Sequence, residues 1–232
     1  MTRMANARIA GVACLFYMAV GIPNELLMNR ATGAELTPAT LARIAEYTTD
    51  VRIAILLKLL ECFSAIVLGV ALYGITRQQD HELAMLALLC RAAEGVTIAL
   101  ILIPNDLGLL TLAKARAAGP APGVDTSNAL ALLMIPIGSI GAIFFAVGTG
   151  IFSYLLLRGR TIPVSLACLG VFSSALLALG LPLQLAGFFT GALTGYQWLP
   201  EIVFTIVLAL WLLIKGVGPI AAPRRDEHFP PT

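Results

Sequence analysis

The stretch ALLCRAAEGVTIALILIP, residues 87–104, is apolar enough to cross a membrane, yet it holds Arg91 and Glu94 one helical turn apart. A membrane-spanning helix needs about 20 predominantly apolar residues, which is the length of the run around these two charges. A charged side chain at the centre of a bilayer costs about 2.5–3.5 kcal/mol on insertion scales. The two charges therefore need a structural or functional reason, and the rest of the chain limits what that reason is.

The composition of the whole chain is that of an integral membrane protein. Of its 232 residues, 59% are hydrophobic and only 12% are charged, whereas globular chains carry about 25% charged residues. The runs of about 20 apolar residues predict an all-α polytopic membrane protein surrounded by membrane lipids. The formal net charge of +2 and the short segments between the runs indicate no nucleic-acid partner.

Six apolar runs are long enough to be spans, which predicts six transmembrane helices. The predicted spans are Ile9–Met28, Ile53–Ile75, Leu83–Ile103, Ala129–Leu157, Val164–Phe189 and Leu199–Ile214. Two longer connections, residues 30–50 and 105–127, are expected outside the spans. We interpret residues 1–217 as one six-helix transmembrane domain and residues 218–232 as a polar cytoplasmic tail.

The basic residues beside the spans indicate the orientation of the chain. Lys and Arg concentrate on the cytoplasmic side of membrane proteins. If the N-terminus is cytoplasmic, the cytoplasmic flanks carry Arg3, Arg8, Arg77, Arg158, Arg160, Lys215, Arg224 and Arg225, and the opposite flanks carry Arg30, Arg43, Arg52, Lys114 and Arg116. This excess favours N- and C-termini that are both cytoplasmic.

The second predicted span carries a second pair of charges, Lys58 and Glu61, so that four charged side chains lie near the middle of the membrane. Both pairs are spaced i, i+3 and can interact within their own helix. Because the two helices are consecutive and antiparallel, we expect Lys58 to pair with Glu94 and Glu61 to pair with Arg91. The four residues either fix the helix register or form a polar binding site or a proton path.

A second polar set lies toward the predicted outer face: Asn24, Glu25, Asp106 and Glu201. Interfacial carboxylates are commonly just solvated. The alternative is an outward-facing vestibule that leads to the four membrane charges.

The fourth and fifth predicted spans contain helix-breaking residues. Pro136 and Pro182, the latter two residues before Gln184, predict kinks because proline removes a backbone hydrogen bond. Gly187, Gly191 and Gly195 follow at GxxxG spacing, which predicts a face for close packing against another helix, in a homo-oligomer or with a membrane partner.

The sequence contains no pattern typical of a metal or cofactor site. The two histidines, His81 and His228, both lie outside the predicted spans, whereas haem, di-iron and intramembrane zinc sites usually need buried histidine. We find no nucleophile motif, Walker loop or dinucleotide fingerprint. We therefore expect no cofactor, no metal and no catalytic residue.

Two segments carry a resemblance to a known family. ARIAGVACLFYMAVGIPNELL (residues 7–27) and LALWLLIKGV (residues 208–217), with RAAE at residues 91–94 in the third span, resemble the bacterial six-span membrane proteins grouped as domain of unknown function 4386. In that family a glutamate stands close to the last segment, whereas here Glu201 lies ten residues before Trp211. The resemblance implies the six-span topology and the bacterial plasma (inner) membrane, and it implies no activity.

Three functions are compatible with these residues. We favour binding or transport of a small molecule or ion by Lys58, Glu61, Arg91 and Glu94. The alternatives are a membrane-embedded enzyme that acts on a lipid or isoprenoid head group, with a glutamate as acid or base, and a non-catalytic partner or regulatory subunit.

Overall fold

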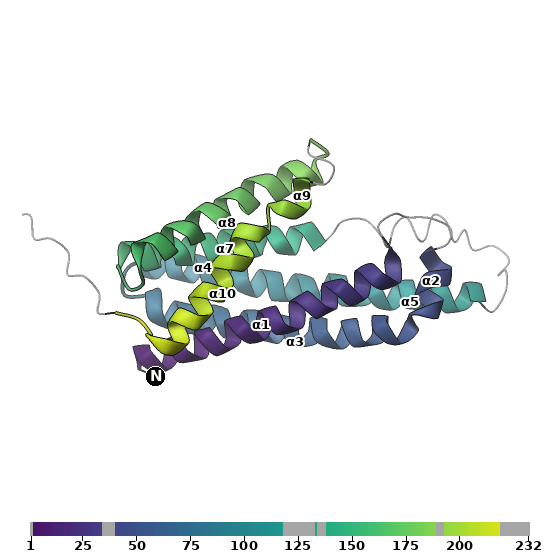
Figure 1. Ribbon diagram of the computed structural model, residues 1–232, viewed down its shortest axis with the longest axis horizontal. Helices are drawn as coiled ribbons and strands as arrows, with labels where there is room; N and C mark the ends of the chain where they lie inside the picture. Colours follow the sequence, from purple (N-terminus) through teal and green to yellow (C-terminus); the bar gives the residue numbers. More distant parts are fainter. Residues whose placement is uncertain (1, 34–39, 118–132, 134–137, 189–192, 219–232) are drawn as a thin grey trace, which may run out of the picture.

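The computed structural model describes residues 2–33, 40–117, 133, 138–188 and 193–218, and these form an elongated bundle of helices (Figure 1). In chain order the helices are α1 (Arg3–Thr32), α2 (Thr40–Glu46), α3 (Thr48–Thr76), α4 (His81–Thr97), the π-helical turn η1 (Ile98–Leu102), α5 (Ile103–Ala117), α7 (Gly138–Arg158), α8 (Val164–Leu185), α9 (Leu193–Tyr196) and α10 (Leu199–Ile214). Five helical segments have at least 18 residues and are apolar enough to cross a membrane, and α10 is a shorter apolar helix. The prediction of an all-α, multi-span membrane protein is confirmed.

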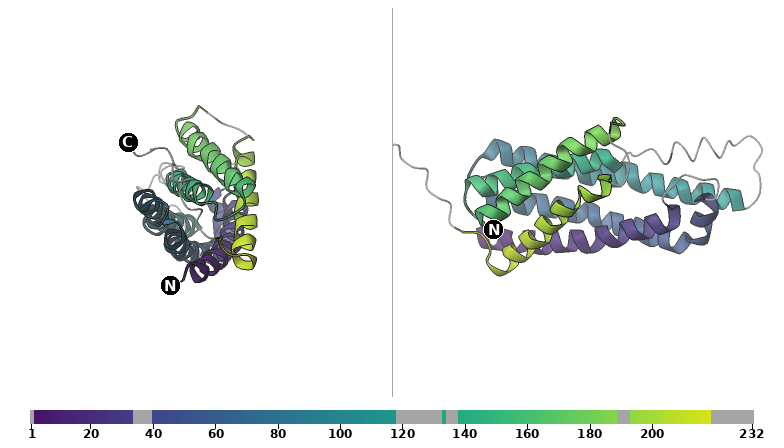
Figure 2. Two further views of the ribbon diagram at one scale, coloured as in Figure 1. Left: turned by 90° about the vertical axis from the view of Figure 1, so that its left-hand side faces the viewer. Right: turned by 45° about the horizontal axis from the view of Figure 1, so that its top comes forward.

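The long helices pack in a ring in the order α1, α3, α4, α7, α8 and α10. Helices α1 and α3 pack along most of their length, and α4 lies between α3 and α7. Helix α8 packs on α7, and α10 contacts both α8 and α1. Figure 1 and the right-hand view of Figure 2 show α10 crossing α1 obliquely and then rising away from it toward α8 and α9.

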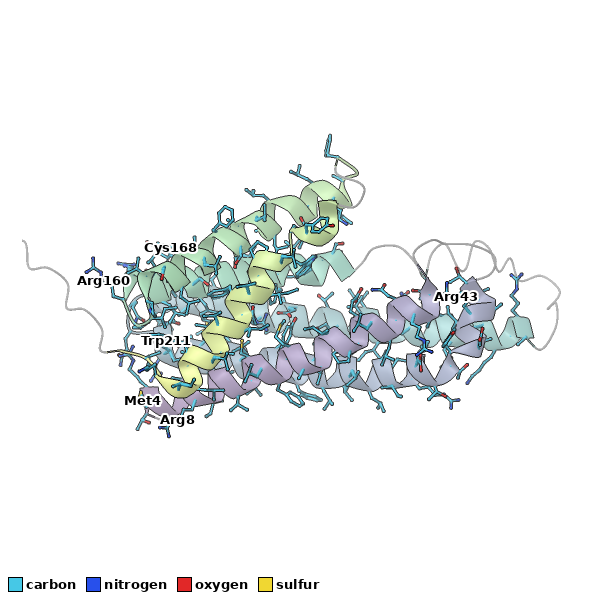
Figure 3. All side chains as sticks on the ribbon, viewed as in Figure 1. Met4, Arg8, Arg43, Arg160, Cys168 and Trp211 are labelled. Atoms are coloured by element: carbon cyan, nitrogen blue, oxygen red, sulfur yellow. The ribbon has the colours of Figure 1, made fainter. Side chains whose placement is uncertain are left out.

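Small residues allow the close crossing of α1 and α10. A Cβ atom on Gly11 would lie 2.7 Å from Leu213 Cγ and 2.9 Å from the carbonyl oxygen of Ala209. Ala7, Ala10 and Ala13 of α1 are also buried. The start of α1 and the end of α10 therefore lie at the same end of the bundle. In Figure 3, Arg8 and Arg160 lie near this end and Arg43 lies near the other.

The third predicted span ends later than the sequence indicates. We predicted an end at Ile103 and a connection from residue 105, but the helix continues through η1 and α5 to Ala117. The backbone widens into a π-turn just before Pro104, where the amide of Ile103 bonds the carbonyl of Ile98. This widening accommodates a proline that would otherwise clash with the preceding turn.

A small core explains why α5 stays helical beyond the predicted span. Leu109, Leu110 and Ala113 of α5 pack with Leu41 and Ile44 of α2. Helix α2 is separated from α3 only by Tyr47. The 37-residue helix from His81 to Ala117 is about 55 Å long at 1.5 Å per residue, which exceeds the roughly 30 Å hydrocarbon core. The α2–α5 contact thus forms an extension of the bundle.

The fifth predicted span ends too late, because α8 ends at Leu185 rather than at Phe189 and the three glycines therefore do not extend α8. Gly187 follows with φ +82°, a conformation that favours glycine and ends a helix. Neither Gly187 nor Gly195 would bring a Cβ within 4 Å of another residue, and Gly191 lies outside the described residues. Pro136, the start of the fourth predicted span and residues 219–232 of the predicted tail also lie outside them. A partner that binds through Gly187, Gly191 and Gly195 stays a prediction.

Candidate functional site

A cavity of about 750 Å³ lies among the long helices of the bundle. Its walls come from α1, α3, α4, η1, α7, α8, α9 and α10. Its polar lining residues are Tyr17, Asn24, Glu25, Lys58, Glu61, Glu94, Ser139, Gln184, Trp198, Glu201 and Thr205. Pockets of about 300–1,000 Å³ are the usual size for small-molecule sites. The cavity is therefore the candidate functional site.

Arg91 lies behind this cavity rather than in its wall. Its guanidinium forms an ion pair with Glu94, with 2.7 Å between Arg91 Nη1 and Glu94 Oε2. The guanidinium carbon also lies 5.1 Å and 5.0 Å from the ring centres of Tyr17 and Phe145, a cation–π geometry. Arg91 is 1% exposed, so its charge is neutralised inside the protein.

Two glycines make room for the stem of Arg91. A Cβ on Gly69 of α3 would lie 2.9 Å from Arg91 Cβ, and a Cβ on Gly148 of α7 would lie 3.4 Å from Arg91 Cγ. The side chain is therefore clamped between the backbones of two helices. This packing holds Arg91 in position and leaves Glu94 facing the cavity.

Glu94 connects the buried arginine to the cavity wall. Its Oε2 pairs with Arg91, and its Oε1 accepts a 2.7 Å hydrogen bond from the hydroxyl of Tyr17. The carboxylate is only 2% exposed. With an ion pair and a hydrogen bond, Glu94 has the partners that a buried carboxylate needs.

Lys58 pairs with Asp106 of α5, and the distance from Lys58 Nζ to Asp106 Oδ2 is 2.5 Å. Both side chains are largely buried. Lys58 lines the cavity, but Asp106 does not. Asp106 therefore neutralises Lys58 from behind, as Arg91 does for Glu94.

The expected cross-pairing of the two helices is wrong. Arg91 faces Gly69 of α3, and Gly69 is eight residues, or roughly 12 Å at 1.5 Å per residue, from Glu61. The short turn between Thr76 and His81 sets this register. Pairing within one helix is found for Arg91 and Glu94 but not for Lys58 and Glu61.

Glu61 has a different environment from the other three membrane charges. Its Oε2 accepts a 3.3 Å hydrogen bond from Asn24 Nδ2. In the described part of the chain no Lys, Arg or His lies within ion-pair distance of it. Glu61 therefore faces the cavity with a neutral partner only.

Glu201 enters the cavity wall from the first turn of α10. Its Oε2 accepts hydrogen bonds from Ser173 Oγ at 2.6 Å and from Ser174 Oγ at 3.4 Å. It is 2% exposed, and its Oε1 accepts no hydrogen bond from any described residue. Glu201 is thus a second buried carboxylate without a cation partner in the described structure.

Three members of the second polar set line the cavity. Asn24 and Glu201 are buried rather than solvated, whereas Glu25 is exposed at the edge and accepts a hydrogen bond from Asn29. The fourth, Asp106, is buried behind Lys58. The structure thus places Asn24, Glu25 and Glu201 in one cavity with the membrane charges, while Arg91 and Asp106 support it from behind.

Pro182 and Gln184 lie where α8 reaches the cavity. Pro182 is within the last turn of α8, so it precedes the end of the helix instead of kinking its middle. Gln184 lines the cavity and accepts a 3.2 Å hydrogen bond from Gln197 Nε2.

Sequence reasoning missed Tyr17, Phe145 and Trp198, which also line the cavity. Tyr17, Gly21 and Asn24 recur at helical spacing on α1 and form one polar face in an apolar span. Trp198 stands three residues before Glu201, which is the same face of a helix. The spacing of these residues is the signal that could have identified them.

Helices α1 and α10 cross at one end of the bundle and diverge beside the cavity. The two helices contact each other from Met4–Gly216 through Gly11–Leu213 to Cys14, whose thiol lies 3.6 Å from the carbonyl of Thr205. Beyond that point the residues of both helices line the cavity instead, and Ile22 is exposed on the outer surface. Figure 1 shows this divergence of α10 from α1.

Comparison with known proteins gives a family and no function. Residues 9–216 match the family described as Domain of unknown function (DUF4386). No curated protein and no solved structure matches the chain.

Proposed function

The chain belongs to the DUF4386 family, and we propose that it binds a small molecule or ion inside the membrane, as a binding protein or a transporter. The observation that carries the proposal is the cavity of about 750 Å³ that Lys58, Glu61, Glu94 and Glu201 line from three helices, α3, α4 and α10. Ionisable residues inside membrane proteins usually mark substrate, ion or proton pathways.

The pairing of the charges supports a binding site rather than a device for helix register alone. Arg91–Glu94 and Lys58–Asp106 are neutralised pairs, and such pairs set how helices pack. Glu61 and Glu201 belong to neither pair. Glu201 is buried and Glu61 is half-buried in the cavity wall. Because a carboxylate removed from water without a cation is costly, these two residues are better explained by a ligand than by packing.

Transport requires moving parts, and two prolines lie beside the cavity. Pro23 is inside α1 between the lining residues Ile22 and Asn24, and Pro182 is inside α8 next to the lining residue Leu181. Each proline removes one backbone hydrogen bond and weakens its helix locally. We propose these positions as the points where the cavity walls bend, in a bacterial plasma membrane with both termini in the cytoplasm.

Filling the cavity tests this proposal. A ligand present at a hundred times its dissociation constant stabilises a protein by about 2.7 kcal/mol, which raises the melting temperature by roughly 5–10 °C for a chain of this size. In a panel of amines, carboxylates, alcohols, amino acids and alkali-metal salts, we expect one class to give such a shift. We expect Ala142→Trp, in the cavity wall, to abolish it.

Ile140→Trp is the matched control, because Ile140 lies on the same helix but is exposed and does not line the cavity. This variant should keep the shift. Equal stabilisation of Ala142→Trp and the wild type would place binding elsewhere and contradict the proposal, as would the absence of a shift with every class.

A further inference from the structure

The cavity wall has an excess of negative charge that the described residues do not neutralise. The described cations nearest to it are both engaged, Lys58 by Asp106 and Arg91 by Glu94. Glu61 and Glu201 receive only neutral donors, from Asn24 and from Ser173 and Ser174. A ligand that enters this cavity meets Glu25, Glu61 and Glu201, which have no cation partner among the described residues, and no unpaired described cation.

Two buried acceptors in the same wall have neither a hydrogen-bond donor nor an ion-pair partner among the described residues, whereas Glu94 Oε2 is paired with Arg91. Glu201 Oε1 and Asn24 Oδ1 accept no hydrogen bond from the described residues, and their residues are 2% and 5% exposed. Both residues line the cavity. A buried acceptor without a donor costs about 1–3 kcal/mol, so the wall is suited to a ligand that brings N–H or O–H donors.

The remainder of the wall suits an apolar body. Met18 and Ile22 of α1 and Ile202 of α10 are apolar lining residues, and Trp198, which also lines the cavity, stands three residues before Glu201. An indole beside a carboxylate is suited to an organic cation, because the ring face attracts positive charge. No group of three His, Cys, Asp or Glu among the described residues is arranged to hold a metal ion.

We propose that the ligand is an organic ammonium or guanidinium ion with an apolar body, which reaches the cavity from the lipid between α1 and α10. Its positive charge faces Glu61 and Glu201, and its N–H groups donate to Glu201 Oε1 and Asn24 Oδ1. The inference rests on the proposed binding function and specifies the class of ligand.

The test compares four probes that share one eight-carbon chain: octylamine, octyltrimethylammonium, octanol and octanoate. Binding is measured by titration calorimetry with the protein in phosphatidylcholine nanodiscs, and the heat from empty nanodiscs is subtracted. We expect octylamine to bind at least tenfold more tightly than octanol and octanoate. Octyltrimethylammonium should bind more weakly than octylamine, because it has the charge but no N–H donor.

Glu61→Gln should weaken octylamine binding at least tenfold and leave octanol binding unchanged. Glu46→Gln removes the same charge from an exposed residue of α2. This variant should leave the affinities for octylamine and for octanol unchanged. The comparison of the four probes uses the wild-type protein alone. It therefore tests the preference for a cation even if Glu61→Gln does not fold.

The outcomes separate the two proposals. If octanoate or octanol binds as tightly as octylamine and Ala142→Trp abolishes that binding, the site exists but the cation assignment is wrong. Octylamine affinity that does not change in Glu61→Gln would also overturn the assignment. If no probe binds and Ala142→Trp changes nothing, this inference and the proposed function for these compounds fail together.

Discussion

Replacing Arg91 by methionine is expected to destabilise the protein by about 3–5 kcal/mol, because the change leaves Glu94 as an uncompensated buried charge. Both side chains are almost fully buried, and their ion pair measures 2.7 Å. Methionine fills most of the space between Gly69 and Gly148, so the loss of stability comes from the unpaired charge rather than from a cavity. The measurement is the melting temperature in mild detergent, with size exclusion to monitor the folded fraction. We expect a decrease of roughly 6–20 °C.

The double variant Arg91→Met with Glu94→Leu is the control. Removing both partners of a buried pair is often neutral or stabilising, so the double variant should recover most of the lost stability. Lys58→Met alone should cost less, because the Lys58 side chain is 12% exposed whereas that of Arg91 is 1% exposed. If Arg91→Met melts like the wild type, the ion pair does not hold α4 against α3 and α7.

The two charges of residues 87–104 therefore have different roles in the structure. Arg91 points into the packed helices, where two glycines and two aromatic rings surround it. Glu94 reaches the cavity wall and presents an oxygen to Tyr17. One member of the pair contributes to helix packing, and the other shapes the candidate site.

The spans could be predicted from the sequence because burial in lipid requires long apolar helices. Their ends could not, because local contacts decide them. The helix after Pro104 continues because a π-turn absorbs the proline and because Leu109 and Leu110 find partners on α2. Neither the widened turn nor the distant partner is visible in an apolar run.

The residues of the site were easier to predict than their pairing. Intramembrane charges are conspicuous, so Lys58, Glu61, Arg91 and Glu94 are evident in the sequence. Their partners depend on helix register, which the turn before His81 and the small residues at the contacts determine. Lys58 therefore meets Asp106, 48 positions away, and Glu61 has no cation partner among the described residues.

Replacing Gly11 by leucine is expected to destabilise the protein by about 1–3 kcal/mol, because the crossing of α1 and α10 has no space for a side chain. A Cβ atom there would already lie 2.9 Å from the carbonyl oxygen of Ala209. A backbone atom cannot rotate away as a side chain can, so the two helices must separate. We expect a melting temperature in detergent lower by roughly 2–12 °C.

Ala19→Leu is the matched control, since it adds a similar side chain to the same helix at an exposed position, and it should melt like the wild type. The crossing at Gly11 also determines how far α1 and α10 diverge beside the cavity. If Gly11→Leu remains folded, the double variant Gly11→Leu with Ile22→Cys should react with a cysteine-reactive lipid probe faster than the single variant Ile22→Cys does. An unchanged labelling rate together with an unchanged melting temperature would show that the α1–α10 crossing controls neither the stability of the protein nor the separation of α1 and α10 beside the cavity.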